Sequence, residues 1–253
     1  GTANSQFLAR VDQIITGQPQ RGSNVLLTLD PDLQRVAAEA LGSYQGAVVA
    51  IEPSTGRVLA MATSPSFDTN TLAVHDSIAV NNTYDELLNA AVDPLTNRAI
   101  DELNPPGSTF KLVVASAALS SGQFTPDSTF ANPSSYVLPG TSTTIHNFDG
   151  NACGSGDQVT LATALRLSCN IPMAQLAVAL GDDAIRAEAK KYGFETRFDI
   201  PLAVTASNYP DGPLSDDQTA QTGYGQLDVT ATPLQIAMVS AGIANKGIVM
   251  NPR

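Results

Sequence analysis

Apolar residues fall into short runs along the chain, and the spacing within each run predicts a strand followed by a helix near the start. The apolar and β-branched run at 25–29 predicts the strand. Asp30 and Pro31 then predict a helix start, because Asp caps helices and Pro fits the first turn. One face of this helix is apolar and comprises Leu33, Val36, Ala37, Ala40 and Leu41. Gly42 predicts its end.

Two nearly continuous apolar runs, 46–51 and 57–62, flank a turn-forming segment at 52–56. That segment contains Pro53 and Gly56, so the two runs predict a β-hairpin. A strand with one solvent-exposed face alternates apolar and polar residues. The continuous runs therefore predict that helices cover both faces of the hairpin.

The middle of the chain predicts a helical body. Residues 112–119 are all apolar or small, which predicts a helix buried on every side and closed by Gly122. Weaker helical signals lie at 83–92, 159–167, 171–180 and 182–192. Residues 123–158 predict short strands and loops, and residues 196–222 predict a long loop.

A capped helix and a short strand are expected in the last part of the sequence. Thr232, Pro233 and Gln235 predict a capping box with Pro in the first turn. The helix that it opens is expected to run to Ala244, and residues 248–250 predict the beginning of a strand.

Composition narrows the class of protein. The 253 residues are 43% hydrophobic and 15% charged, which suffices for a core and excludes a disordered chain. The formal net charge of −11 argues against a surface that binds nucleic acid or an anionic membrane. No run approaches the roughly 18 consecutive apolar residues that a membrane-spanning helix needs.

The first 24 residues show no pattern that predicts a folded unit. It begins Gly1-Thr2-Ala3 rather than with Met, and residues 1–24 are polar and mixed. No basic and apolar pattern typical of a signal peptide is visible there. We expect residues 1–24 to be an entry segment, the remnant of a larger N-terminal region.

Cysteine and histidine are scarce, with two of each. Their positions show no zinc spacing, and we expect neither a metal nor a cofactor. Cys153 and Cys169 permit one disulfide or two buried free thiols, and the sequence alone leaves both readings open.

The first candidate for chemistry is Ser108 with Lys111. Pro105, Pro106 and Gly107 force a non-helical entry, so Ser108 is expected at the N-terminus of the buried helix, where developing negative charge is stabilised. Lys111 lies three residues on, hence on the same helical face. A lysine in apolar surroundings loses its charge more readily and can accept the serine proton. The alternative is a serine cap followed by an exposed lysine.

The second candidate is Ser168-Cys169-Asn170, just before an apolar helix. A hydroxyl and a carboxamide two residues apart in a turn can point into one cleft, where they relay a proton and hold a peptide. The alternative is a polar helix cap. Residues 223–226 contain two glycines but lack the context of a phosphate-binding loop, so a packing turn is expected there.

An ordered set of motifs gives these candidates a context. It includes Pro53-Ser54-Thr55-Gly56, Asn97-Arg98-Ala99, Pro106-Gly107-Ser108-Thr109-Phe110-Lys111, Ser168-Cys169-Asn170 and Gly223-Tyr224-Gly225-Gln226. From about residue 25 onward the chain resembles the penicillin-binding proteins, and the class B transpeptidases in particular.

The resemblance implies an α+β fold of the penicillin-binding transpeptidase and serine β-lactamase type. That fold has an antiparallel sheet covered by helices plus an all-helical subdomain, here as one domain at 25–253. The resemblance also implies that Ser108 is the acylated nucleophile and Lys111 its base. Ser168 would relay the proton, and Asn170 would orient the amide of the substrate.

By the same resemblance, the protein would be a D,D-transpeptidase that cross-links peptidoglycan stem peptides ending in D-Ala-D-Ala and is acylated by β-lactams. It would lie on the extracytoplasmic face of the plasma membrane, anchored by an N-terminal helix absent from this chain. Its partners would be membrane-bound division or elongation proteins. An oxidising compartment favours the disulfide between Cys153 and Cys169.

One departure from the family pattern matters. No Lys-Thr-Gly or Lys-Ser-Gly occurs in the chain, although the family carries this motif on a sheet-edge strand. We therefore expect a C-terminally incomplete domain, with the remaining strands beyond Arg253, rather than an inactive protein. The oxyanion hole would combine the Ser108 N–H with a donor from a missing strand.

Two other functions share this pattern. A serine β-lactamase needs a base for its deacylating water, yet residues 196–207 contain Asp199 and no glutamate. A non-catalytic β-lactam sensor or division scaffold would keep Ser108 and Lys111 but lose turnover.

Overall fold

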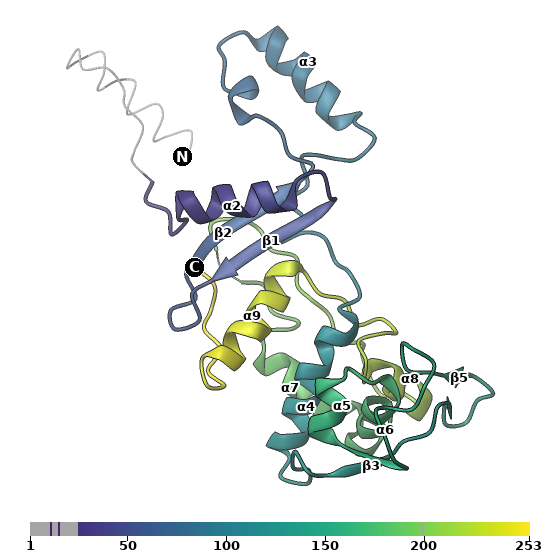
Figure 1. Ribbon diagram of the computed structural model, residues 1–253. Coiled ribbons are helices and arrows are strands. Elements are labelled where there is room, and N and C mark those ends of the chain that lie inside the picture. Colours follow the sequence, from purple (N-terminus) through teal and green to yellow (C-terminus); the bar gives the residue numbers. More distant parts are fainter. Residues whose placement is uncertain (1–10, 12–14, 16–24, 199) are drawn as a thin grey trace.

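The computed structural model describes residues 11, 15, 25–198 and 200–253. The expected entry segment at 1–24 thus lies almost wholly outside the described residues. The described chain forms an elongated molecule with a projecting arm at one end, a hairpin in the middle and a helical body at the other end (Figure 1).

The predicted hairpin is present. Strands β1 (Gly46–Ile51) and β2 (Val58–Ser64) are antiparallel, with Gly46 opposite Ser64. Helices α2 (Pro31–Leu41) and α9 (Pro233–Ala244) lie on its two sides (Figure 1). The prediction that helices cover both faces is confirmed.

Alternate residues of the hairpin supply two separate cores, as the two-residue repeat of a strand requires. Toward α2, one cluster contains Ala37, Val48, Ala50, Ala60 and Ala62. Toward α9, another contains Ala47, Val49, Ile51, Met61, Leu234 and Met238. The small residues on the α2 side let that helix pack closely on the strands.

The predicted strand at 25–29 is wrong. The segment has no regular structure, and Leu26 is 99% exposed. It runs beside β2 but is held by the hydroxyl of Thr28, which donates to the Val58 carbonyl over 2.7 Å. The next helix is as predicted, because Asp30 Oδ1 caps α2 by accepting from the N–H groups of Asp32 and Leu33.

The predicted strand at 248–250 is also wrong, since these residues are irregular. Pairing with β2 is confined to Arg253, which donates to the Gly56 carbonyl and accepts from the Val58 N–H. The capping box at α9 is half formed. Thr232 Oγ1 accepts from the Gln235 N–H, but the Gln235 side chain donates to the Tyr192 carbonyl instead of returning to Thr232.

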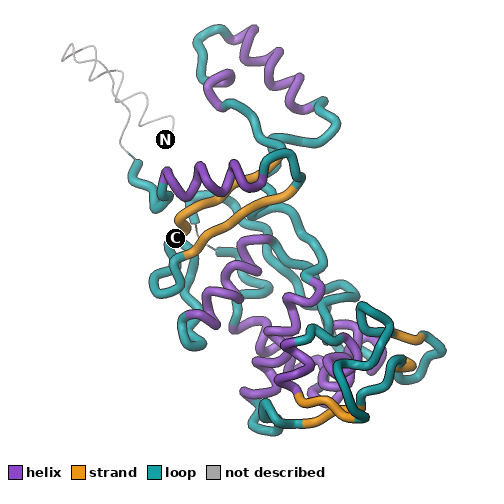
Figure 2. The backbone as a smooth tube through the Cα atoms, in the orientation of Figure 1, coloured by secondary structure: helices purple, strands orange, loops and turns teal. Residues whose placement is uncertain are grey.

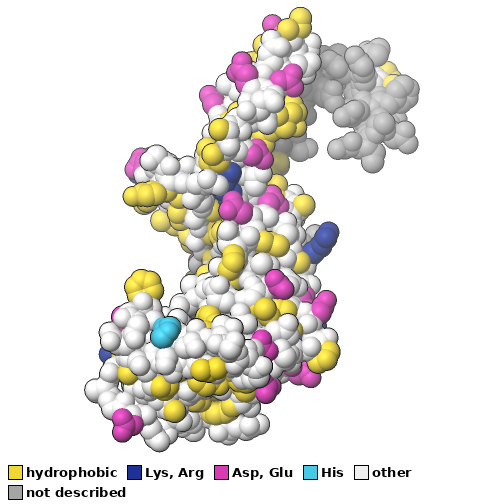
Figure 3. Space-filling view, turned by 90° about the vertical axis from the view of Figure 1, so that its right-hand side faces the viewer, with side chains coloured by type: hydrophobic (Ala, Val, Ile, Leu, Met, Phe, Trp, Pro, Cys, Tyr) yellow, Lys and Arg dark blue, Asp and Glu magenta, His cyan; other side chains and the backbone are white. Residues whose placement is uncertain are grey.

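The arm carries a 3-10 turn at Thr69–Leu72 and α3 (Ser77–Leu88). The helix expected at 83–92 begins earlier because Asp76 accepts from the N–H groups of Ile78 and Ala79. No residue of α3 is buried, and hydrophobic and acidic side chains lie side by side at this end of the molecule (Figure 3).

The helical body consists of α4 (Lys111–Ser120), α5 (Leu161–Arg166), α6 (Asn170–Leu180), α7 (Asp182–Lys191) and α8 (Asp216–Thr222). The prediction of a buried helix at 112–119 is confirmed for most of its length, since α4 packs against both α6 and α7, but its last residue, Leu119, is 48% exposed. Helix α8 contradicts the long loop expected at 196–222. Its sequence is polar, and its start is a capping box between Ser215 and Gln218.

Two short antiparallel pairs lie on the helical body (Figure 2). Strand β3 (Thr129–Ala131) pairs with β6 (Gln158–Thr160), and β4 (Tyr136–Val137) pairs with β5 (Thr144–Ile145). They confirm the short strands and loops expected at 123–158. No helix among the described residues has both the length and the apolar character that crossing a bilayer demands.

Candidate active site

Ser108 lies where the sequence predicts, at the entry to the buried helix. Gly107 has a φ of 54°, and a 3-10 turn over Gly107–Phe110 leads directly into α4. Phe110 is fully buried between the rings of Phe194 and Tyr209, with centroids 5.5 and 5.9 Å away. This aromatic anchor fixes the turn and leaves the Ser108 side chain exposed at the surface.

Lys111 has no solvent exposure, and its ammonium group lies at the centre of the candidate site. Nζ is 3.0 Å from Ser108 Oγ and 2.9 Å from Asn170 Oδ1. It is also 2.6 Å from the Ser168 carbonyl and 3.2 Å from Ser168 Oγ. The structure thus brings together all four predicted residues, and the alternative of an exposed lysine is wrong.

The burial of Lys111 changes its acid–base behaviour. Removal from water lowers the pKa of the Lys111 ammonium from 10.5 to about 8, because the charged form loses solvation. At pH 7 about a tenth of the molecules then carry a neutral amine, against well under a thousandth for an unperturbed lysine. A neutral amine 3.0 Å from Ser108 Oγ can accept the hydroxyl proton.

Ser168 lies in the turn between α5 and α6 with a φ of 57°. This left-handed conformation is uncommon for a residue with a side chain and is found at functional sites. Here it directs both the carbonyl and the hydroxyl of Ser168 at Lys111. The first turn of α6 is capped by the side chain of Asn147 and not by the Ser168 side chain. The alternative of a simple polar cap is therefore not supported.

The two cysteines form a disulfide, with Cα atoms 5.7 Å apart. Both side chains are buried and pack with Val159 and Ala164. The bond joins the loop before β6 to the middle of the second motif, where Cys169 stands between Ser168 and Asn170. The alternative of two free thiols is thereby excluded.

An open depression of about 430 Å³ lies over Ser108. Its lining residues are mostly polar: Gly107, Ser108, Asn170, Gln221, Tyr224, Gln226 and Leu227. No carboxylate lines it.

The turn at 223–226 packs directly against the entry to α4. Gly225 accepts a hydrogen bond from the Gly107 N–H, and a Cβ atom at Gly225 would stand 2.1 Å from the Gly107 carbonyl oxygen. The expected packing role is confirmed. The same turn also supplies Tyr224 and Gln226 to the depression, a contribution that the sequence analysis missed. In the sequence, only the two glycines that flank Tyr224 indicated a special role for this turn.

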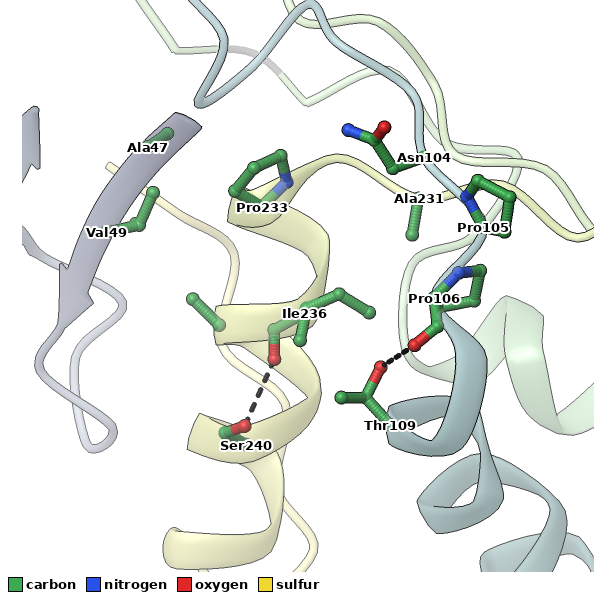
Figure 4. A pocket seen from close by; sticks show the side chains of 11 residues that line it. Ala47, Val49, Asn104, Pro105, Pro106, Thr109, Ala231, Pro233, Ile236 and Ser240 are labelled. Carbon is green, nitrogen blue, oxygen red and sulfur yellow. Dashed lines mark hydrogen bonds between the residues drawn. The ribbon is translucent and has the colours of Figure 1, made fainter. Parts of the chain in front are cut away.

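A second hollow of about 440 Å³ lies on the other side of this entry (Figure 4). Its lining includes Ala47 and Val49 of β1, Pro233 and Ile236 of α9, and Pro105 and Pro106, with α9 lying between β1 and the two prolines in this view (Figure 4). No titratable side chain lines this hollow, so the chemistry is assigned to the depression over Ser108. The described part of the chain contains no cluster of three or more His, Cys, Asp or Glu that could hold a metal ion.

Comparison with known proteins agrees with this geometry. Residues 46–253 match the family described as the penicillin binding protein transpeptidase domain. The whole chain is 40% identical to 52% of the peptidoglycan D,D-transpeptidase PbpA of Mycolicibacterium smegmatis. The chain spans about half the length of the curated relatives it matches.

Two solved structures extend the likeness to the fold. Penicillin-binding protein A of M. tuberculosis, as its ceftriaxone acyl-enzyme, is 39% identical with a TM-score of 0.90 over 97% of this chain and 56% of that one. A chain of a peptidoglycan synthase complex is 30% identical with a TM-score of 0.80 over 93% of this chain and 46% of that one. The residues that surround Ser108, the arrangement of the helices and these matches together show that the chain belongs to the penicillin-binding protein transpeptidase family.

Proposed function

We propose that the protein is a peptidoglycan D,D-transpeptidase in which Ser108 is the nucleophile and Lys111 the base. The observation that carries this proposal is the buried Lys111 amine in hydrogen-bond distance of Ser108, Ser168 and Asn170. The name of the mycobacterial relative supports the reaction, and the solved acyl-enzyme of another relative supports the covalent step.

In the first step, Ser108 Oγ attacks the carbonyl carbon of the D-Ala-D-Ala bond while its proton passes to Lys111 Nζ. The carbon–nitrogen bond breaks, the leaving amine takes a proton through Lys111, and D-alanine departs. An ester to Ser108 remains. The amine of a second stem peptide then attacks the ester, gives up a proton toward Lys111, and Ser108 Oγ leaves protonated.

Ser168 and Asn170 are assigned the proton relay and the binding of the substrate amide. Ser168 is an exposed residue with its Oγ 3.2 Å from Lys111 Nζ, so it can pass a proton between that amine and the leaving nitrogen. Asn170 uses one Nδ2 hydrogen on the His146 carbonyl and keeps a second hydrogen for the substrate. Oxyanion stabilisation begins at the Ser108 N–H, which has no hydrogen-bond acceptor among the described residues.

β-Lactams are proposed to acylate Ser108, in line with the ceftriaxone acyl-enzyme of the M. tuberculosis relative. The proposed substrate is a stem peptide ending in D-Ala-D-Ala. The proposed partners are membrane-bound division or elongation proteins, in line with the relative in a peptidoglycan synthase complex. The disulfide favours the extracytoplasmic face of the membrane, where oxidation is possible.

The transpeptidase unit is proposed to run from about residue 25 and to include strands beyond Arg253. Among the described strands, β1 pairs only with β2, so its other edge is open. A two-stranded hairpin is only marginally stable, and both faces of this one are already covered by helices. Further strands on the open edge of β1 would give the sheet the size that these helices require.

A β-lactamase is the second candidate, and the lining of the depression argues against it. Deacylating water needs a base, yet no carboxylate lines the depression. Glu195, the glutamate nearest to 196–207, pairs with Lys190 over 2.9 Å. Asp199 lies outside the described residues.

The test combines three measurements on the wild type and on Ser108→Ala. Fluorescent penicillin should label the wild type, and a stem-peptide analogue should release D-alanine when an acceptor amine is present. Ser108→Ala should do neither while remaining folded, because the Ser108 hydroxyl makes one hydrogen bond, with Lys111 Nζ, and its loss costs only about 1 kcal/mol. Rapid penicillin hydrolysis would favour the β-lactamase, and labelling without transfer would favour the sensor or scaffold.

A further inference from the structure

The loop that follows β5 holds the second motif at several points. Asn147 is 6% exposed, and its Oδ1 accepts from the N–H groups of Asn170 (2.8 Å) and Ile171 (3.0 Å). Its Nδ2 donates to the Asn151 carbonyl over 2.8 Å. The donor bond orients the carboxamide, so that the oxygen and not the nitrogen faces α6.

This arrangement replaces an ordinary helix cap. The first N–H groups of a helix have no partner within the helix and are commonly satisfied by the residue just before it. Cys169 occupies that position in α6, but its side chain makes no capping bond because its sulfur is in the disulfide. Asn147, distant in sequence, supplies the missing acceptor.

The same loop also holds the Asn170 side chain. Asn170 Nδ2 donates to the His146 carbonyl over 3.1 Å, while Asn170 Oδ1 lies 2.9 Å from Lys111 Nζ. Residues 146 and 147 thus fix both the backbone and the carboxamide of a residue that contacts the amine. The disulfide ties the neighbouring Cys169 but satisfies none of these polar groups.

We propose that Asn147 is a positioning residue for acylation, which acts by holding Asn170, and through it the second motif, against Lys111. This proposal rests on the proposed function. Without the Asn147 oxygen, two N–H groups at the start of α6 lose their acceptor. The first turn of α6 loosens, and Asn170 is no longer held at the distance that Lys111 requires.

The test compares three variants of the protein, with fluorescent penicillin as the probe. Asn147→Ala removes the oxygen, whereas Asn147→Asp keeps an acceptor toward α6, loses the donor to the Asn151 carbonyl and adds a negative charge, which the N-terminus of α6 favours. Asn132→Ala is the matched control. Asn132 is also 6% exposed and makes three hydrogen bonds, but to Cys153 and Gly156 and not to the second motif.

Rates are measured per folded molecule as a function of penicillin concentration. Asn147→Ala is expected to lower the limiting acylation rate tenfold or more, with little change in the concentration that gives half of it. Asn147→Asp is expected to stay within threefold of the wild type. Asn132→Ala is expected to lower the melting temperature and to leave the acylation rate within twofold.

Two rate results would overturn the proposal: wild-type acylation by Asn147→Ala, or equal slowing in Asn132→Ala. A crystal structure of Asn147→Ala decides the point separately from activity. If Asn170 Oδ1 stays within hydrogen-bond distance of Lys111 Nζ in that structure, the positioning role is refuted. A wild type that penicillin does not label would contradict the proposed function instead, and the crystal structure would still test Asn147.

Discussion

Acylation of Ser108 is expected to depend steeply on pH, because only the neutral form of Lys111 can take the serine proton. Burial lowers the pKa of this lysine from 10.5 to about 8. The neutral fraction is then about 1% at pH 6, about 10% at pH 7 and about 90% at pH 9. The acylation rate constant should therefore rise about tenfold per pH unit up to pH 7 and level off above pH 9.

Measuring the second-order rate constant for penicillin acylation between pH 6 and 9.5 tests this expectation. The control variant is placed at His146, whose backbone carbonyl accepts from Asn170 Nδ2. Its ring is exposed, so His146→Gln is a suitable control that should leave the profile unchanged. A rate independent of pH, or a pH dependence that vanishes in His146→Gln, would refute the assignment of Lys111 as the base.

Three further changes test other parts of the structure. The pKa of Lys111 is lower in the folded than in the unfolded chain, so the unfolded chain binds more protons between pH 8 and 10.5. The free energy of unfolding should therefore rise with pH in this range. Lys111→Met should remove the rise, as measured by urea titrations. Replacing Cys153 and Cys169 by Ala should lower the free energy of unfolding by about 3 kcal/mol, and a urea-measured loss under about 1 kcal/mol would contradict the chain-entropy reasoning. Gly225→Ala should abolish penicillin labelling, because the new Cβ would lie 2.1 Å from the backbone of Gly107. In the control Gly122→Ala, the glycine also has a positive φ but a Cβ would meet open space. That control should keep its labelling and lose only about 1 kcal/mol of unfolding free energy, as measured by thermal melting.

The parts of the fold that follow from local pattern were predictable. The continuous apolar runs of β1 and β2 and the run of apolar and small residues after Lys111 in α4 could be placed from the sequence, because segments packed between other elements are rich in apolar residues. The run at 25–29 has the same composition but lies on the outside of β2. An apolar run indicates that a strand is favourable, but it does not show whether a second strand is available to pair with it.

The residues of the candidate site likewise fall into those that the sequence could predict and those that it could not. Ser108 and Lys111 share one helix entry, so their contact follows from a spacing of three residues. The roles of Asn147 and Tyr224 depend on loops distant in sequence that meet only in the folded chain. The polar helix α8 escaped prediction because packing of a few small residues, and not an apolar stripe, holds it in place.

The backbone contact between Gly107 and Gly225 has a consequence for how the protein is made. The turn that supports the nucleophile is far from it in sequence, so the two can meet only after the intervening helices have been synthesised and have packed. Contacts of such long sequence separation carry a large loop-closure entropy and form late in folding. Helix α4 also lacks its packing partners α6 and α7 until they have been synthesised, so a partly synthesised chain presents no finished site and Ser108 becomes reactive late.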